Sequence, residues 1–61
     1  MDEILKDRYG HKIGTIKEVG NKLYIYDEHG HKAGYYDPNT NKTYDEHGHF
    51  VGTGNLLTSL I

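Results

Sequence analysis

The chain has 61 residues, no cysteine and a formal net charge of −2. Its length limits it to one domain, and without cysteine no disulfide can stabilise it. A domain this small buries only about 60% of the surface that its unfolded chain exposes, which leaves a metal ion or partner chains as the usual supplements to stability. Lysine and arginine are spread singly along the sequence and the N-terminus lacks an apolar leader, so we expect no nucleic acid or membrane partner and a cytoplasmic location.

An internal repeat is the strongest pattern in the sequence. Three octets, residues 7–14, 27–34 and 45–52, align without gaps at offsets of 20 and 18 residues. Each reads Asp, two variable residues, Gly, His, one variable residue, a small or β-branched apolar residue, and Gly. Shared residues at these positions in three copies predict three copies of one structural unit.

Each octet predicts a tight hairpin turn. Its Asp can accept hydrogen bonds from backbone N–H groups two residues on, and its first Gly supplies the positive φ of a type I turn with a G1 bulge. Its second Gly falls inside the outgoing strand, where glycine marks a bend or a close approach by another group. The residues predicted at these structural positions are Asp7, Gly10, Gly14, Asp27, Gly30, Gly34, Asp45, Gly48 and Gly52.

β-forming residues enter and leave each turn, most clearly at residues 23–26. The segments between the units, residues 18–21 and 37–41, are rich in turn formers and return the chain. We therefore predict an all-β fold, an antiparallel meander of about six short strands in a single domain of residues 1–61. Its three hairpin repeats cover residues 4–19, 23–37 and 42–53.

The last eight residues, 54–61, leave the repeat pattern. They hold four of the chain's 13 Leu, Ile, Val and Phe residues, spaced as one stripe of a short helix with Asn55 as its N-cap. Because the hairpins alone carry too few large apolar residues for a core, we expect this tail to join subunits or to pack into a shared core. The predicted oligomer-interface residues are Leu56, Leu57, Leu60 and Ile61, and closed symmetry favours a trimer or tetramer.

Histidine is concentrated at the turns, as His11, His29, His31, His47 and His49. Imidazole is a common ligand of Zn, Ni and Cu, and two His-Gly-His turns would form a site if the hairpins curl together. The alternative, which we favour, is that His29 and His47 are exposed turn residues while the others pack or hydrogen-bond near the hairpin necks. The main prediction is therefore no cofactor, with a Zn, Ni or Cu site as the alternative.

Tyrosine supplies most of the aromatic residues. Strand alternation places Tyr24 and Tyr26 on the face opposite Leu23 and Ile25, so both faces of that strand carry apolar bulk. The whole candidate surface consists of Tyr24, Tyr26, Tyr35, Tyr36 and Tyr44. It is interpreted first as core and subunit interface, because tyrosine packs well against glycine, and second as a platform for a small molecule or glycan.

Signatures of catalysis are absent from the sequence. There is no cysteine nucleophile, and Ser59, the only serine, lies in the apolar tail. The Asp residues already have a turn role, and no phosphate-binding glycine motif precedes a helix. We therefore predict that the protein is not an enzyme.

The segments 26–30 and 44–48, both Tyr-Asp-Glu-His-Gly, resemble the Tyr-Asp-x-x-Gly core of bacterial YD (Rhs-type) repeats. Over residues 4–53 the chain also resembles small bacterial and phage-associated β-flower proteins, in which short hairpins radiate about an axis. The first unit departs from the pattern, with Lys6 where Tyr is expected. The β-flower resemblance implies a compact all-β body that is oligomeric and has no established activity.

Together these observations predict a non-enzymatic, homo-oligomeric β-repeat module with a structural or adaptor role. Two alternatives belong to other classes: a His-lined transition-metal protein, and a small-molecule or glycan-binding module that uses the tyrosine surface.

Overall fold

The three predicted turns form with the same hydrogen bonds in the computed structural model, which describes residues 2–61. In the second turn, Asp27 Oδ1 accepts from the backbone N–H of His29 and of His31, both at 2.9 Å, and Gly30 N–H donates to the Asp27 carbonyl at 3.0 Å. Asp7 and Asp45 make the equivalent bonds in the other two turns. Gly10, Gly30 and Gly48 have φ values of 81 to 84°, so the predicted turn chemistry is confirmed.

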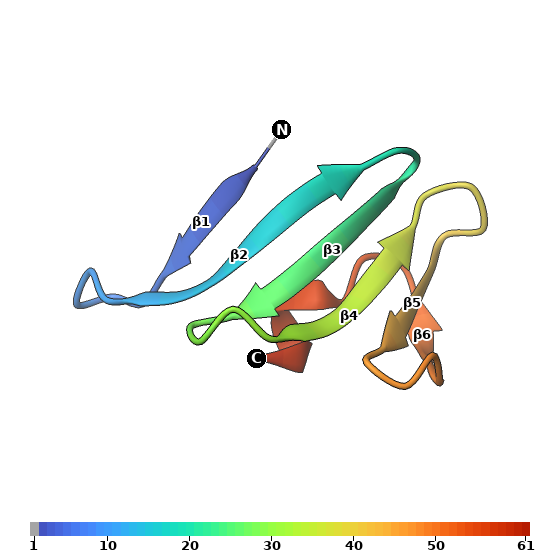
Figure 1. Cartoon of the computed structure of the whole chain (residues 1–61). Helices are drawn as coiled ribbons and strands as arrows, with labels where there is room; N and C mark the ends of the chain where they lie inside the picture. Colours follow the sequence, from blue (N-terminus) through green and yellow to red (C-terminus); the bar gives the residue numbers. More distant parts are fainter. Residues whose placement is uncertain (1) are drawn as a thin grey trace.

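Six antiparallel strands pair in chain order to form one meander sheet, which confirms the predicted all-β fold (Figure 1). After each turn the register shifts by one residue, so that Ile13, Ala33 and Val51 bulge out of the ladder. The strands are β1 (Glu3–Lys6), β2 (Lys12–Val19), β3 (Lys22–Asp27), β4 (Lys32–Asp37), β5 (Lys42–Asp45) and β6 (Phe50–Thr53).

The return turns lie at the opposite ends of the strands. β2 is longer than expected and reaches Val19, so the link to β3 is short and contains Gly20 with φ 61°. Between β4 and β5, Asp37 Oδ1 accepts from Asn39 N–H at 3.0 Å and Asn41 has φ 58°. Asn and Gly tolerate this left-handed conformation better than other residues, which explains the turn-former composition of both links.

The apolar tail folds back onto its own sheet. Its 3-10 helix η1 (Leu57–Leu60) lies against β3 and β4, behind them in the view of Figure 1. The N-cap of this helix is Leu56 and not the predicted Asn55, whose side chain nevertheless accepts a hydrogen bond from Leu57 N–H at 3.2 Å. The tail thus packs onto the sheet of its own chain, and its predicted role in joining subunits stays a prediction.

The core is small and centres on three fully buried side chains, Ile25, Thr43 and Leu57. The Thr43 hydroxyl donates to the Gly54 carbonyl at 2.6 Å and accepts from Leu56 N–H at 3.1 Å. This hydroxyl connects the start of the tail to β5. It supplies the hydrogen bonds that the Gly54 carbonyl and the Leu56 N–H would otherwise lack once they are shielded from water.

The second glycine of each repeat makes room for one tail side chain. A Cβ built at any of these glycines would lie 2.5 to 2.6 Å from a terminal methyl group of the tail. The pairs are Gly14 with Ile61, Gly34 with Leu60, and Gly52 with Leu56. The close approach that the sequence pattern predicted is therefore made by the tail, and at Gly14 and Gly34 also by a carbonyl oxygen of the neighbouring strand.

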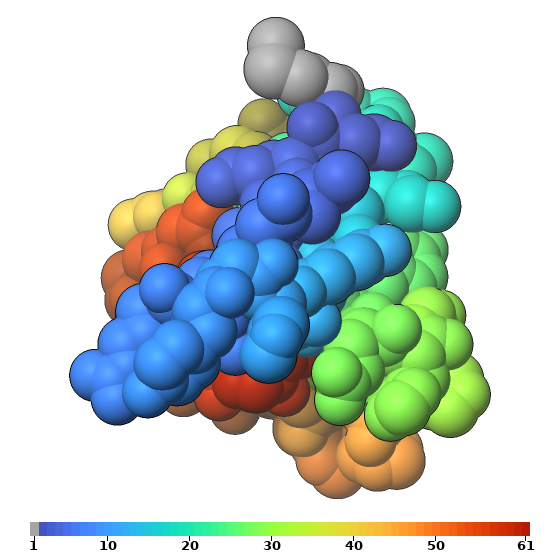
Figure 2. Space-filling model, turned by 90° about the vertical axis from the view of Figure 1, so that its left-hand side faces the viewer, coloured from blue at the N-terminus to red at the C-terminus, as the bar shows by residue number. Residues whose placement is uncertain are grey.

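Figure 2 looks onto the first hairpin, in blue, with the red end of the chain emerging beneath it. In the same view the β3–β4 turn, in green, and the β5–β6 turn, in orange, project toward the lower right. Within residues 2–61 the structure contains no helix long and apolar enough to span a membrane.

Candidate functional site

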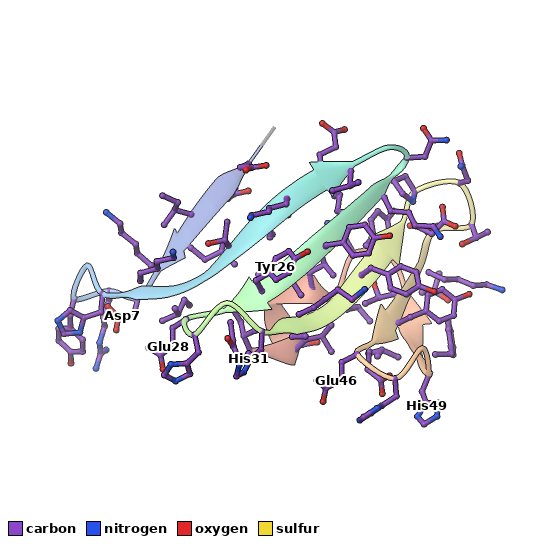
Figure 3. The ribbon with its side chains drawn as sticks, viewed as in Figure 1. Asp7, Tyr26, Glu28, His31, Glu46 and His49 are labelled. Atoms are coloured by element: carbon purple, nitrogen blue, oxygen red, sulfur yellow. The ribbon has the colours of Figure 1, made fainter. Side chains whose placement is uncertain are left out.

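The face of the sheet opposite the tail carries most of the aromatic residues, and we call it the outer face. Ile25 and Thr43 point to the tail, so their strand neighbours Tyr24, Tyr26 and Tyr44 point to the outer face. In Figure 3, Tyr26 lies over β3 on the side turned to the viewer, while η1 lies behind the sheet. The outer face is thus separate from the core.

Four rings form a row across β3 to β6 on this face. Tyr24 pairs with Tyr35, Tyr35 with Tyr44, and Tyr44 with Phe50 in the strand register. The ring centroids are 5.8, 5.1 and 6.1 Å apart, and the Tyr35 and Tyr44 rings are stacked with an interplanar angle of 22°. The row forms because the strand register places one aromatic residue from each of these four strands side by side on the same face.

Lysines accompany these rings. The Nζ atoms of Lys17, Lys22, Lys32 and Lys42 lie over Tyr26, Tyr35, Tyr24 and Phe50, at 4.8 to 5.9 Å from the ring centroids. Lys12 lines the same face beside Lys17, and Lys6 pairs with Lys12. All six lysines of the chain therefore lie on the outer face, where cation–π contacts hold four of them.

Most acidic residues lie elsewhere. Five of the nine are in the hairpin turns, namely Asp7, Asp27, Glu28, Asp45 and Glu46. In the strand register Glu3 lies opposite Ile16 and Glu18 lies opposite Leu23, so both are on the tail side, the face of the sheet on which the tail packs. Asp2, Asp27 and Asp37 remain near the lysines, so six lysines against three carboxylates leave an excess of three positive charges on the outer face. The molecule is locally basic although its net charge is −2.

A pocket of about 410 Å³ opens at the β1–β3 end of the outer face. Ile4 and Tyr26 form its apolar wall, and Lys12, Thr15 and Lys17 of β2 contribute polar groups. Its size falls within the range of about 300 to 1,000 Å³ that is usual for small-ligand sites.

The histidines lie at the turns, away from the core. All five side chains are 70 to 81% exposed, and each faces a carboxylate of its own turn at 3.5 to 3.8 Å. The turns bring together His29 with His31 and His47 with His49, at ring centroid distances of 6.3 and 5.9 Å. Within residues 2–61, no three His, Asp or Glu side chains form a group that could hold a metal ion.

Two turn carboxylates are held in their charged form. The backbone N–H of His31 donates to Asp27, and this hydrogen bond lowers the pKa of the carboxyl below its ordinary value of 3.8. The N–H of His49 lowers the pKa of Asp45 in the same way. The same hydrogen bonds that form the turns therefore cause these pKa shifts. The two turns are marked in Figure 3 by the labelled residues Glu28, His31, Glu46 and His49.

The structure places one predicted surface residue differently from the others. Tyr36 pairs with Leu23 and with the buried Thr43, so it lies on the tail side, where its hydroxyl donates to Asn41 Oδ1 at 2.6 Å. Tyr24, Tyr26, Tyr35 and Tyr44 do lie together. Of the predicted interface residues, Leu57 is fully buried in its own chain, whereas Leu56 and Ile61 are 37 and 39% exposed.

Sequence reasoning missed the basic character of the outer face. The lysines are scattered along the chain, and only strand alternation gathers them. A detectable signal was present in the Lys-x-Tyr spacing of Lys22 with Tyr24 and Lys42 with Tyr44, which puts a cation and a ring on the same face of one strand.

Comparisons with protein-family models, curated proteins and solved structures give no match to this chain.

Proposed function

We propose that this protein is a non-enzymatic β-repeat module that acts by binding and assembly, and that its outer face contacts an anionic partner. The observation that carries the proposal is the gathering of all six lysines around the aromatic row, where they outnumber the three carboxylates of Asp2, Asp27 and Asp37 within residues 2–61. Such a face attracts carboxylate, sulfate or phosphate groups through charge and offers tyrosine hydroxyls for hydrogen bonds.

Single-stranded nucleic acid fits this face poorly. Recognition of unpaired bases uses aromatic rings with a free π-face. Here Tyr35 is flanked by Tyr24 and Tyr44 in the row, and Lys22 lies over it. The face presents ring edges, hydroxyls and ammonium groups, which favours an anionic partner that is recognised by hydrogen bonds rather than by stacking.

Assembly into a trimer or tetramer, and kinship with YD-repeat and β-flower proteins, are part of the same proposal. Exposed apolar side chains of the tail support assembly, since Leu56 and Ile61 are 37 and 39% exposed. Light scattering of the full chain should give a mass three or four times that of one chain. A monomeric mass at high concentration would contradict the assembly part.

A His-lined Zn, Ni or Cu site is the alternative function. Because the second and third turns each bring two imidazoles near each other, a metal there would need further ligands from water or another copy. Metal analysis of purified, untagged protein tests this alternative.

The binding proposal is tested with poly-glutamate as the anionic probe. Titration of dye-labelled protein should show binding that weakens as salt rises, because salt screens exposed charges. Removing two outer-face charges in the Lys22→Gln/Lys42→Gln variant should weaken binding by about tenfold, or ~1.4 kcal/mol.

Arg8→Gln is the matched control, because Arg8 lies in the first turn beside Tyr9 rather than on the outer face. It should change the affinity little. Equal losses in both variants, or no binding by the parent protein at low salt, would refute the outer face as the binding surface.

A further inference from the structure

The pocket at the β1–β3 end of the outer face has the composition of a site for a hydroxyl-rich ring. A sugar ring combines an apolar face of C–H groups with a rim of hydroxyls that both donate and accept hydrogen bonds. Ile4 and Tyr26 supply an apolar wall, while Lys12 and Lys17 supply donors and Thr15 supplies both a donor and acceptors.

Two carboxylates complete the pocket, Asp2 from the start of the chain and Asp27 from the second turn. They balance the charges of Lys12 and Lys17, so the pocket itself is close to neutral although the outer face is basic. Asp27 is also held in place, because its Oδ1 atom accepts two backbone hydrogen bonds from His29 and His31. A neutral pocket with fixed donors and acceptors suits hydroxyl groups better than a bare anion.

The pocket adjoins the lysine and aromatic row without a break. Tyr26 forms part of the pocket wall, and the Nζ atom of Lys17 lies 5.3 Å from the centroid of its ring. Tyr24, two residues earlier on β3, points to the same face. An occupant that places one ring in the pocket therefore continues over Lys22, Lys32 and Lys42. Those lysines require negative charges in the remainder of that occupant.

We infer that the outer face binds a segment of an acidic polysaccharide, with one sugar ring in the pocket and carboxylates of neighbouring sugars against the lysines. This inference rests on the proposed function and specifies the anionic partner. A flexible polymer can follow the twist of the sheet visible in Figure 1, and its repeated carboxylates match lysines on successive strands.

Three polymers separate sugar recognition from charge recognition. Polygalacturonate has both sugar rings and carboxylates, poly-glutamate has carboxylates alone, and dextran has uncharged sugars alone. At equal low salt and matched chain length, the protein should bind polygalacturonate about tenfold more tightly than poly-glutamate and should bind dextran most weakly.

Thr15→Val and Lys42→Gln form a matched pair of variants. Thr15 lines the pocket, and valine keeps its branched shape in β2 while removing the hydroxyl; Lys42 lies at the other end of the face. Thr15→Val should reduce the preference for polygalacturonate to near parity, with poly-glutamate binding unchanged. Lys42→Gln should weaken the binding of both acidic polymers and leave the preference in place.

Amide resonances provide a readout that does not depend on any variant folding. Galacturonate oligomers should shift the signals of Thr15, Tyr26 and Gly30, whereas poly-glutamate should shift mainly signals near the lysine row. Equal affinity for the two acidic polymers, retention of the preference in Thr15→Val, or dextran binding as tight as polygalacturonate would overturn this inference and leave the proposed function standing. Failure of both acidic polymers to bind would instead refute the proposed function.

Discussion

Leu60 fills the space above Gly34 that the Cβ of any other residue would occupy. A Cβ built there would lie 2.5 Å from Leu60 Cδ1 and would also press on the backbone carbonyl oxygen of Tyr44. The absence of a Cβ at Gly34 therefore makes room both for the tail and for the backbone of the neighbouring strand. Because all three repeats have a glycine at this position, one side chain of the tail packs against each repeat.

Gly34→Ala should destabilise the protein by about 1 to 3 kcal/mol, since neither the Tyr44 backbone nor the buried face of the sheet can move aside cheaply. Gly52→Ala is the matched control. There the added methyl meets only the side chain of Leu56, which is 37% exposed and can rotate away. Urea unfolding of both variants should rank Gly34→Ala as clearly less stable, and equal midpoints would contradict the account of the tail.

Gly30→Val should destabilise by more than about 1 kcal/mol, because Gly30 has φ 84° and a β-branched residue is poorly tolerated there. Beyond its two chain neighbours, no described atom lies within 4 Å of the position a Cβ would take, so any loss reports backbone strain rather than a clash. Gly30→Asn should lose less, since asparagine adopts this conformation more readily. Thermal melting distinguishes the two, and a melting temperature for Gly30→Val equal to that of the parent would refute the turn assignment.

Thr43→Val should cost about 1 to 3 kcal/mol although it preserves the shape of the buried side chain. The substitution removes the hydroxyl that bonds to the Gly54 carbonyl and to Leu56 N–H, and leaves those two groups without that partner. Thr43→Ser keeps the hydroxyl and loses only a methyl group, so it should be the milder change. Urea midpoints in the reverse order would show that packing, not hydrogen bonding, governs this site.

The two turn carboxylates with lowered pKa values make stability depend on pH. A folded-state pKa below the ordinary 3.8 means that the folded chain releases the proton more readily than the unfolded chain, so the contribution is complete above pH ~4. It is lost as pH falls through the lowered folded-state values. Asp27→Asn/Asp45→Asn keeps an acceptor oxygen in each turn but cannot titrate. Its melting temperature should fall less steeply than that of the parent between pH 5 and pH 2, and parallel curves would exclude this contribution.

The sequence by itself determined the hairpins. The spacing of Asp27, Gly30 and their equivalents acts over five residues, and the hydrogen bonds that the turn needs come from the same segment. Strand alternation likewise places Tyr24 and Ile25 on opposite faces without reference to any distant residue. Local chemistry of this kind is readable from sequence because its causes are adjacent in the chain.

Only the tertiary structure decided where the tail and the lysines lie. The apolar pattern of residues 54–61 predicts that the tail is buried, but burial against a neighbouring subunit and burial against the chain's own sheet fit that pattern equally well. The position of Leu60 over Gly34 shows that the tail packs on its own sheet. Lys17 and Lys42 are far apart in sequence, and they share a face because strand pairing and register combine from β2 to β5. Such juxtapositions depend on long-range pairing, so a linear reading of charge could not find the basic outer face or the pocket beside Tyr26.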